Sequence, residues 1–110
     1  MKLSKRECKP CKGGVPPLQG EALLKLADEL GNSWRVVGSH HLEKDFEFKD
    51  FKEALAFTNR VGELAESVSH HPDILLTYGK VKIYLWTHKI DGLVEADFIF
   101  AAKIDEILTH

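Results

Sequence analysis

Three histidines and two acidic residues in the second half of the chain have the types and spacing that proton transfer requires. His70 and His71 stand directly before a proline, and His88 closes a later strand-like segment. Glu66 lies one helical turn before His70, and Asp97 lies near the start of the last helical segment. Imidazole has an unperturbed pKa of about 6.5, so it can give or take a proton near neutral pH. These five residues predict a site for acid–base chemistry.

Each of the two acidic residues has a second interpretation. Because Glu66 precedes His70 by four residues, it could accept a hydrogen bond from the His70 ring and hold its tautomer. Otherwise Glu66 is a solvated helix residue. Asp97 could frame the site, or it could only stabilise the positively polarised first turn of its helix. The sequence leaves both choices open.

A zinc site built from His70, His71 and His88 is the competing chemical interpretation. Adjacent residues project in different directions, whereas metal sites commonly use ligands four apart on a helix or alternate on a strand. Proton transfer without a metal is therefore favoured, and we predict neither a metal nor another cofactor. A second pair, His40 and His41, has no proline after it and no matching partner downstream. For this pair we predict a surface position at the start of a strand.

Hydrophobic periodicity predicts the elements that carry these residues. Helices are expected at residues 18–30, 51–70 and 95–108, and strands at residues 34–37, 41–48, 74–78 and 80–87. Asp50 and Glu53 have the spacing of a helix-capping pair, and Pro72 disfavours helical dihedrals in the residue before it, which ends the long helix near His70. The order α-β-β-α-β-β-α predicts an α+β fold, a four-stranded antiparallel sheet with helices packed on one face.

Alternation in the last predicted strand assigns its side chains to two faces of the sheet. One face receives Val81, Ile83, Leu85 and Thr87, and the other receives Lys82, Tyr84, Trp86 and His88. Tyr84 and Trp86 could stack on a bicyclic ligand beside His88, although aromatic residues in strands more often serve packing. We therefore leave both aromatic residues out of the predicted site.

Length and composition fit one domain. The 110 residues carry a net charge of −2, which gives no basis for binding nucleic acid by charge. Residues 1–17 predict a flexible leader and residues 18–110 a single domain. Cys8 and Cys11 have the spacing of a redox dithiol or half a zinc site, but their place in the leader predicts two reduced cysteines. Without a membrane-length apolar segment or signal-peptide pattern, we predict no membrane association and a cytoplasmic location.

Several motifs point together to one family. They are Glu66 with His70-His71-Pro72, the alternating strand that ends in Thr87-His88, and Gly92-Leu93 followed by Asp97. This combination resembles the signature of the pterin-4a-carbinolamine dehydratases. Trp34 and residues 46–51 and 101–105 also look like that family, so the resemblance covers the whole predicted domain.

The resemblance implies a reaction and the residues that perform it. The reaction is loss of water from a 4a-hydroxytetrahydropterin, formed by an aromatic amino acid hydroxylase, to give the quinonoid dihydropterin in tetrahydrobiopterin recycling. His70 and His88 are implied as acid and base, and His71 as the residue that binds and orients the pterin. Asp97 and Glu66 are implied to complete the substrate site. The resemblance also implies homodimers with joined sheets, often paired into homotetramers, and no metal or redox cofactor.

One departure and two alternatives stand beside this interpretation. The family usually has Thr or Ser where this chain has Val94, and losing that helix cap typically costs about 1 kcal/mol. The main alternative is a non-catalytic or dual-role binding protein, because family members can also act as a dimerisation cofactor for a homeodomain transcription factor or as an assembly factor. A role near molybdopterin metabolism is the second. The intact histidine set favours the enzyme.

Overall fold

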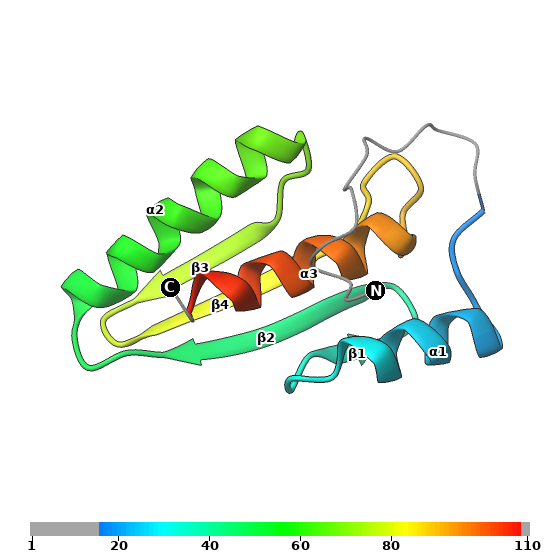
Figure 1. Ribbon diagram of the computed structural model, residues 1–110, viewed down its shortest axis with the longest axis horizontal. Helices are drawn as coiled ribbons and strands as arrows, with labels where there is room; N and C mark the ends of the chain where they lie inside the picture. The colour runs from blue at the N-terminus through cyan, green and yellow to red at the C-terminus, as the bar shows by residue number, and fades with distance from the viewer. Residues whose placement is uncertain (1–15, 109–110) are drawn as a thin grey trace.

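The computed structural model describes residues 16–108 and confirms the predicted order of elements (Figure 1). The elements are α1 (Gly20–Leu30), β1 (Arg35–Val37), β2 (His41–Glu47), α2 (Phe51–Val68), β3 (Asp73–Thr77), β4 (Lys80–Leu85) and α3 (Glu95–Ile107). Apart from residues 16 and 17, the predicted leader lies outside the described residues, and so do its two cysteines. The chain therefore has the α+β fold that the hydrophobic pattern predicts.

The four strands form one antiparallel sheet in the order β1-β2-β4-β3. The central strand β4 pairs Leu85 with Leu42 of β2 and Ile83 with Ile74 of β3. Val81, Ile83 and Leu85 are fully buried, and the alternating pattern leaves the intervening side chains of β4 half-buried on the opposite face. This confirms the predicted division of the strand into two faces.

The helices pack on the face of the sheet that carries these buried side chains (Figure 1). Helix α3 contacts both α1 and α2, so most of its first half is buried. The helical period predicts a buried stripe on this helix made of Phe98, Ala101, Ile104 and Leu108. The first three are fully buried, whereas Leu108 follows the last turn and is half exposed. Across residues 16–108, no helix has both the length and the apolar character that crossing a bilayer requires.

Helix α2 begins as predicted and ends two residues earlier than predicted. The Asp50 carboxylate caps the helix by accepting a hydrogen bond from the Glu53 backbone N–H at 2.9 Å. The buried stripe of α2 consists of Ala54, Phe57, Val61 and Ala65. Phe51 and Leu55 lie beside this stripe and keep 44% and 40% of their surface exposed. The outer side of α2 therefore carries apolar surface.

The open face of the sheet carries a carboxylate with a perturbed pKa. A hydrogen bond with His41 Nε2 (3.0 Å) holds the pKa of Glu43 below its ordinary value near 4.5, and the charges of Lys82 and Arg35 act in the same direction. Burial opposes the shift but does not reverse it. Because the folded pKa is the lower one, this interaction stabilises the fold above the ordinary pKa and is lost as pH falls through the folded value.

We therefore expect the stability advantage of the wild type over Glu43→Gln to shrink between pH 6 and pH 3. Urea denaturation across this pH range measures the free energy of unfolding of both proteins. The variant keeps an amide oxygen that can accept from His41, so the comparison isolates the charge. A difference that stays constant with pH would contradict the assignment.

Candidate active site

The end of α2 directs the His70 side chain into the interior of the protein. The helix stops at Val68, and Ser69 adopts a left-handed conformation with φ of 55°. The His70 backbone N–H then donates to the Ala65 carbonyl at 3.2 Å, which holds the turn against the helix. This turn leaves only 8% of His70 exposed, with its ring edge-on to Phe100.

Asp97 is fully buried in the first turn of α3 and is the hydrogen-bond partner of His70. One carboxylate oxygen, Oδ1, accepts from His70 Nε2 at 2.6 Å. The other, Oδ2, accepts from the Thr87 hydroxyl and from the Val94 backbone N–H, each at 2.9 Å. Asp97 therefore connects α2, the end of β4 and the start of α3.

This pairing selects the chemistry of the two His70 nitrogens. A carboxylate only accepts hydrogen bonds, so His70 Nε2 carries the ring proton and donates a hydrogen bond to Asp97. The other nitrogen, Nδ1, is the one left for a ligand. Carboxylate–histidine pairs elsewhere fix the tautomer and orientation of the imidazole in this way. His70 is thus held ready to accept or deliver a proton through Nδ1.

Of the two interpretations of Glu66, the hydrogen bond to His70 is wrong. Glu66 instead pairs with His71 Nε2, and both side chains are mostly exposed. The prediction assumed that the helix continues through His70, but α2 ends at Val68 and the left-handed Ser69 turns the next side chain inward. His71 consequently receives the exposed glutamate and His70 receives the buried aspartate.

The missing Thr or Ser hydroxyl at Val94 does not displace Asp97. Valine has no side-chain acceptor for the helix N-terminus, and none is present at this cap. Asp97, three residues into the helix, still accepts from the Val94 backbone N–H, which is half of a capping box. The Thr87 and His70 bonds hold the same carboxylate from two other elements, so its placement does not depend on the cap.

His88 reaches the site from the strand side. After β4 ends, the Thr87 backbone N–H donates to the Gly92 carbonyl at 2.9 Å and closes the loop that contains His88. The His88 ring is exposed and lies 4.5 Å, centroid to centroid, from the ring of Trp86. The loop thus presents His88 at the surface, whereas Thr87 points inward to Asp97.

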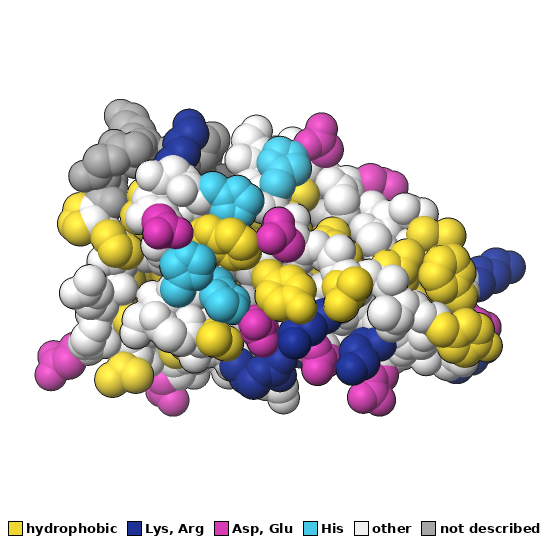
Figure 2. Space-filling model, turned by 180° about the vertical axis from the view of Figure 1, so that it is seen from behind, with side chains coloured by type: hydrophobic (Ala, Val, Ile, Leu, Met, Phe, Trp, Pro, Cys, Tyr) yellow, Lys and Arg dark blue, Asp and Glu magenta, His cyan; other side chains and the backbone are white. Residues whose placement is uncertain are grey.

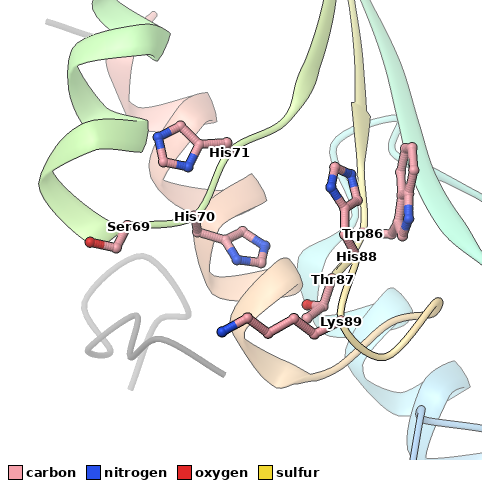
Figure 3. Close-up of a pocket in the computed structure, with 7 residues that line it drawn as sticks. All are labelled: Ser69, His70, His71, Trp86, Thr87, His88 and Lys89. Carbon is pink, nitrogen blue, oxygen red and sulfur yellow. The ribbon is translucent and has the colours of Figure 1, made fainter. Parts of the chain in front are cut away.

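The three predicted histidines line one pocket of about 220 Å³. In Figure 3 the His70 ring points from the end of α2 toward the strand segment that carries His88, and the His71 ring lies above it in this view. One histidine is buried and fixed by a carboxylate, and two are exposed. Such an arrangement can deliver a proton to one atom of a ligand and remove a proton from another.

Four further residues line the pocket, namely Ser69, Trp86, Thr87 and Lys89. Strand alternation predicts that Thr87 faces the core, and its hydroxyl donates a hydrogen bond to Asp97 there. Trp86 also lines the pocket, although its place in an alternating strand predicts a packing role. Lys89 adds a cationic side chain to the pocket. In the sequence, only its position next to His88 indicates that it belongs to the site.

The geometry also bears on the zinc alternative. Within residues 16–108, no group of three His, Cys, Asp or Glu side chains is arranged to hold a metal ion. His70 Nε2 and His71 Nε2 are instead each paired with a carboxylate. Both imidazoles are therefore hydrogen-bonded through Nε2.

The fold and site together define a small α+β protein whose histidines can transfer protons. The chain belongs to the pterin 4 alpha carbinolamine dehydratase family, whose model matches residues 16–107. This finding confirms the resemblance seen in the sequence.

Relatives resemble the chain over nearly their whole length. A Rubrobacter xylanophilus protein named "Putative pterin-4-alpha-carbinolamine dehydratase" is 58% identical over 105 residues, covering 96% of this chain and 97% of that protein. A protein of the same name from Alkaliphilus metalliredigens is 54% identical over 104 residues, covering 94% of both. The matched regions include every element of the site.

Two solved structures share the fold. A transcriptional coactivator/pterin dehydratase from Brucella melitensis has a TM-score of 0.73 and 31% identity, with 81% of this chain and 96% of that chain covered. A pterin dehydratase-like protein identified as a RuBisCO assembly factor in the alpha-carboxysome has a TM-score of 0.61 and 30% identity, with 71% and 92% covered. The fold therefore occurs in proteins with different described roles.

Proposed function

We propose that the chain catalyses dehydration of 4a-hydroxytetrahydropterins. In this reaction the C4a–oxygen bond breaks as the hydroxyl group takes up a proton and leaves as water. The proton on N5 is removed, and its bonding electrons form the C4a=N5 double bond of the quinonoid dihydropterin. One proton is supplied and one is removed, so the reaction needs an acid and a base but no net oxidation.

The observation that carries the proposal is the meeting of His70, His71 and His88 around one pocket, with His70 fixed by the buried Asp97. We assign the acid and base roles to His70 and His88, which come from different elements and can act on two atoms of one substrate. His71 and Glu66 bind and orient the pterin. Asp97 acts through His70 and is a positioning residue.

The proposed substrate also suggests a place for the protein in metabolism. A 4a-hydroxytetrahydropterin forms when an aromatic amino acid hydroxylase turns over, as the family resemblance implies. Its dehydration would return the pterin to tetrahydrobiopterin recycling, in the cytoplasm. The proposed reaction requires neither a membrane nor a nucleic acid partner.

The proposal is tested by following the loss of freshly generated 4a-hydroxytetrahydropterin by ultraviolet absorbance. Chelator-treated wild type is compared with the uncatalysed background and with the His88→Ala variant. We expect wild type to accelerate the loss and the variant to do so far less. A folded wild type that only matches the background would refute the dehydratase proposal.

His71→Ala is expected to raise KM about tenfold and to change kcat by less than about threefold. The side chain is 60% exposed and paired with Glu66 and, in this proposal, binds the pterin without exchanging the reacting protons. Steady-state kinetics of the dehydration provide both constants. Glu66→Ala serves as the comparison and should raise KM by a smaller factor, because it removes only the partner that orients His71. Equal losses in kcat and 1/KM would contradict the separate role.

A second candidate function is protein binding through the outer side of α2. Phe51 and Leu55 lie one turn apart there and remain exposed. We propose that this surface joins copies of the chain into a homotetramer, with homodimers formed through the sheets. Light scattering should show a smaller assembly for a Phe51→Ser/Leu55→Ser variant that keeps dehydratase activity. An unchanged mass would rule out this surface as the contact.

A further inference from the structure

His88 differs from the other histidines that the structure describes, because no carboxylate is paired with it. Each of the others is hydrogen-bonded through Nε2 to a carboxylate, in the pairs His70–Asp97, His71–Glu66, His40–Asp91 and His41–Glu43. Within residues 16–108, the His88 ring has no hydrogen-bond partner, and its contact is with the Trp86 ring, 4.5 Å between centroids. The indole is thus the group that orients this exposed imidazole.

An aromatic contact suits a residue that exchanges protons. A carboxylate would occupy one imidazole nitrogen, whereas the indole leaves both nitrogens of His88 open to a substrate. Because an indole also attracts a cation, the contact can hold both the neutral ring and the protonated ring. Figure 3 shows the Trp86 and His88 rings side by side at the wall of the pocket. This pairing orients His88 without competing for its nitrogens.

Trp86 is held in turn by the His40–His41 pair. The centroids of these two rings lie 5.3 and 5.9 Å from that of the indole. The two Nδ1 atoms lie 3.1 Å apart and each Nε2 faces a carboxylate, so all four ring nitrogens have partners. Figure 2 shows this face of the sheet, where histidine side chains gather around hydrophobic ones. The pair predicted only as the start of a strand therefore supports the indole.

The same pair reaches the loop that carries His88. Asp91 lies in that loop, three residues after His88, and its Oδ1 pairs with His40 Nε2 at 2.8 Å. The Asp91 backbone N–H donates to the Thr87 carbonyl at 2.9 Å, which closes the loop on the strand side. His40 thus ties the loop to the start of β2, while Trp86 supports the ring that the loop presents.

We propose that Trp86 is a positioning residue for His88 and that His40 and His41 support it. The inference rests on the proposed function, in which His88 is one of the two proton-transfer groups. Proton transfer requires a ring nitrogen within about 3 Å of the reacting atom. A misplacement of about 1 Å can lower a rate by about 10²-fold. Holding the exposed ring in one rotamer therefore acts on kcat and not on the affinity for the substrate.

The Trp86→Leu variant tests the inference by separating kcat from KM. We expect kcat for dehydration to fall about tenfold and KM to change by less than about threefold, and Trp86→Phe, which keeps an aromatic ring, to recover most of kcat. Tyr84→Leu is the matched control and should keep wild-type kcat, because Tyr84 lies on the same face of β4 but does not line the candidate active site. A raised KM with unchanged kcat in Trp86→Leu would show that the indole serves the substrate, and would overturn the inference.

Proton NMR gives a readout that does not require turnover. The three-bond couplings between the Hα and Hβ protons of His88 report whether its side chain occupies one χ1 rotamer. We expect one rotamer in wild type and in Tyr84→Leu, an average of several in Trp86→Leu, and an intermediate value in His40→Ala. These couplings test the inference even if wild type does not accelerate dehydration, an outcome that would refute only the proposed function. Averaged couplings in wild type, or couplings that Trp86→Leu leaves unchanged, would overturn the inference.

Discussion

Replacing His88 with alanine is expected to lower kcat for dehydration by about 10²- to 10⁴-fold, the usual contribution of one positioned acid or base. Because the ring is exposed, the free energy of unfolding should change by only about 0.5 kcal/mol. The candidate base or acid on the opposite side of the pocket, His70, stays in place through its bond to Asp97. Loss of rate without loss of stability would therefore identify His88 as one of the two proton-transfer groups.

His88→Phe separates proton transfer from packing. A phenyl ring can keep the contact with the Trp86 ring, whose centroid lies 4.5 Å from that of His88, but it has no nitrogen to titrate. We expect this variant to be as inactive as His88→Ala and to retain pterin binding. Stopped-flow absorbance with freshly generated substrate measures the rate, and thermal denaturation checks the fold. Near-wild-type activity in His88→Phe would mean that the ring serves only as a packing surface.

The fold is predictable from the sequence because its local signals agree with its packing. Apolar alternation in β4 assigns Val81, Ile83 and Leu85 to the core, and the structure buries all three. Asp50 predicts the start of α2 and makes the expected capping bond. The exposed Leu108 is the exception, because it continues the helical period one residue past the end of α3. Periodicity alone does not show where neighbouring elements stop covering a helix.

The histidines of the site are predictable, but their partners are not. Spacing along a helix suggests Glu66 as the hydrogen-bond partner of His70. The helix ends before His70, however, and the left-handed Ser69 turns the His70 side chain away from Glu66. The actual partner, Asp97, is 27 residues away and becomes adjacent only when α2 and α3 pack. Such a contact depends on tertiary structure and leaves no local signal.

The same limit applies to the His40–His41 pair. Its setting in the sequence suggests an ordinary strand start, and β2 does begin at His41. Strand pairing then places Leu42 opposite Leu85, so the pair lies next to Trp86 beyond the end of β4. The register of the strands, and not the local sequence around the pair, therefore brings His40 and His41 beside the candidate active site.

Replacing Asp97 with asparagine is expected to lower kcat by about 10²- to 10⁴-fold while retaining the fold. The Val94 backbone N–H can only donate, so the amide oxygen must stay at the Oδ2 position, where it also accepts from Thr87. The amide nitrogen then faces His70 Nε2 and donates to it. His70 must adopt the opposite tautomer, with its proton on Nδ1, and the nitrogen left for the ligand becomes a donor.

The comparison of Asp97→Asn with two other variants separates this tautomer effect from loss of stability. Asp97→Ala leaves three buried donors without their acceptor and should destabilise the fold by about 3–5 kcal/mol. Thr87→Val removes one donor but keeps the His70 bond, so it should retain the wild-type tautomer and lose less activity. Nitrogen NMR of the His70 ring reports the tautomer, and urea denaturation reports the stability. If Asp97→Asn changes the tautomer yet keeps wild-type kcat, His70 does not transfer a proton through Nδ1, and the assignment of acid and base must move to His71 and His88.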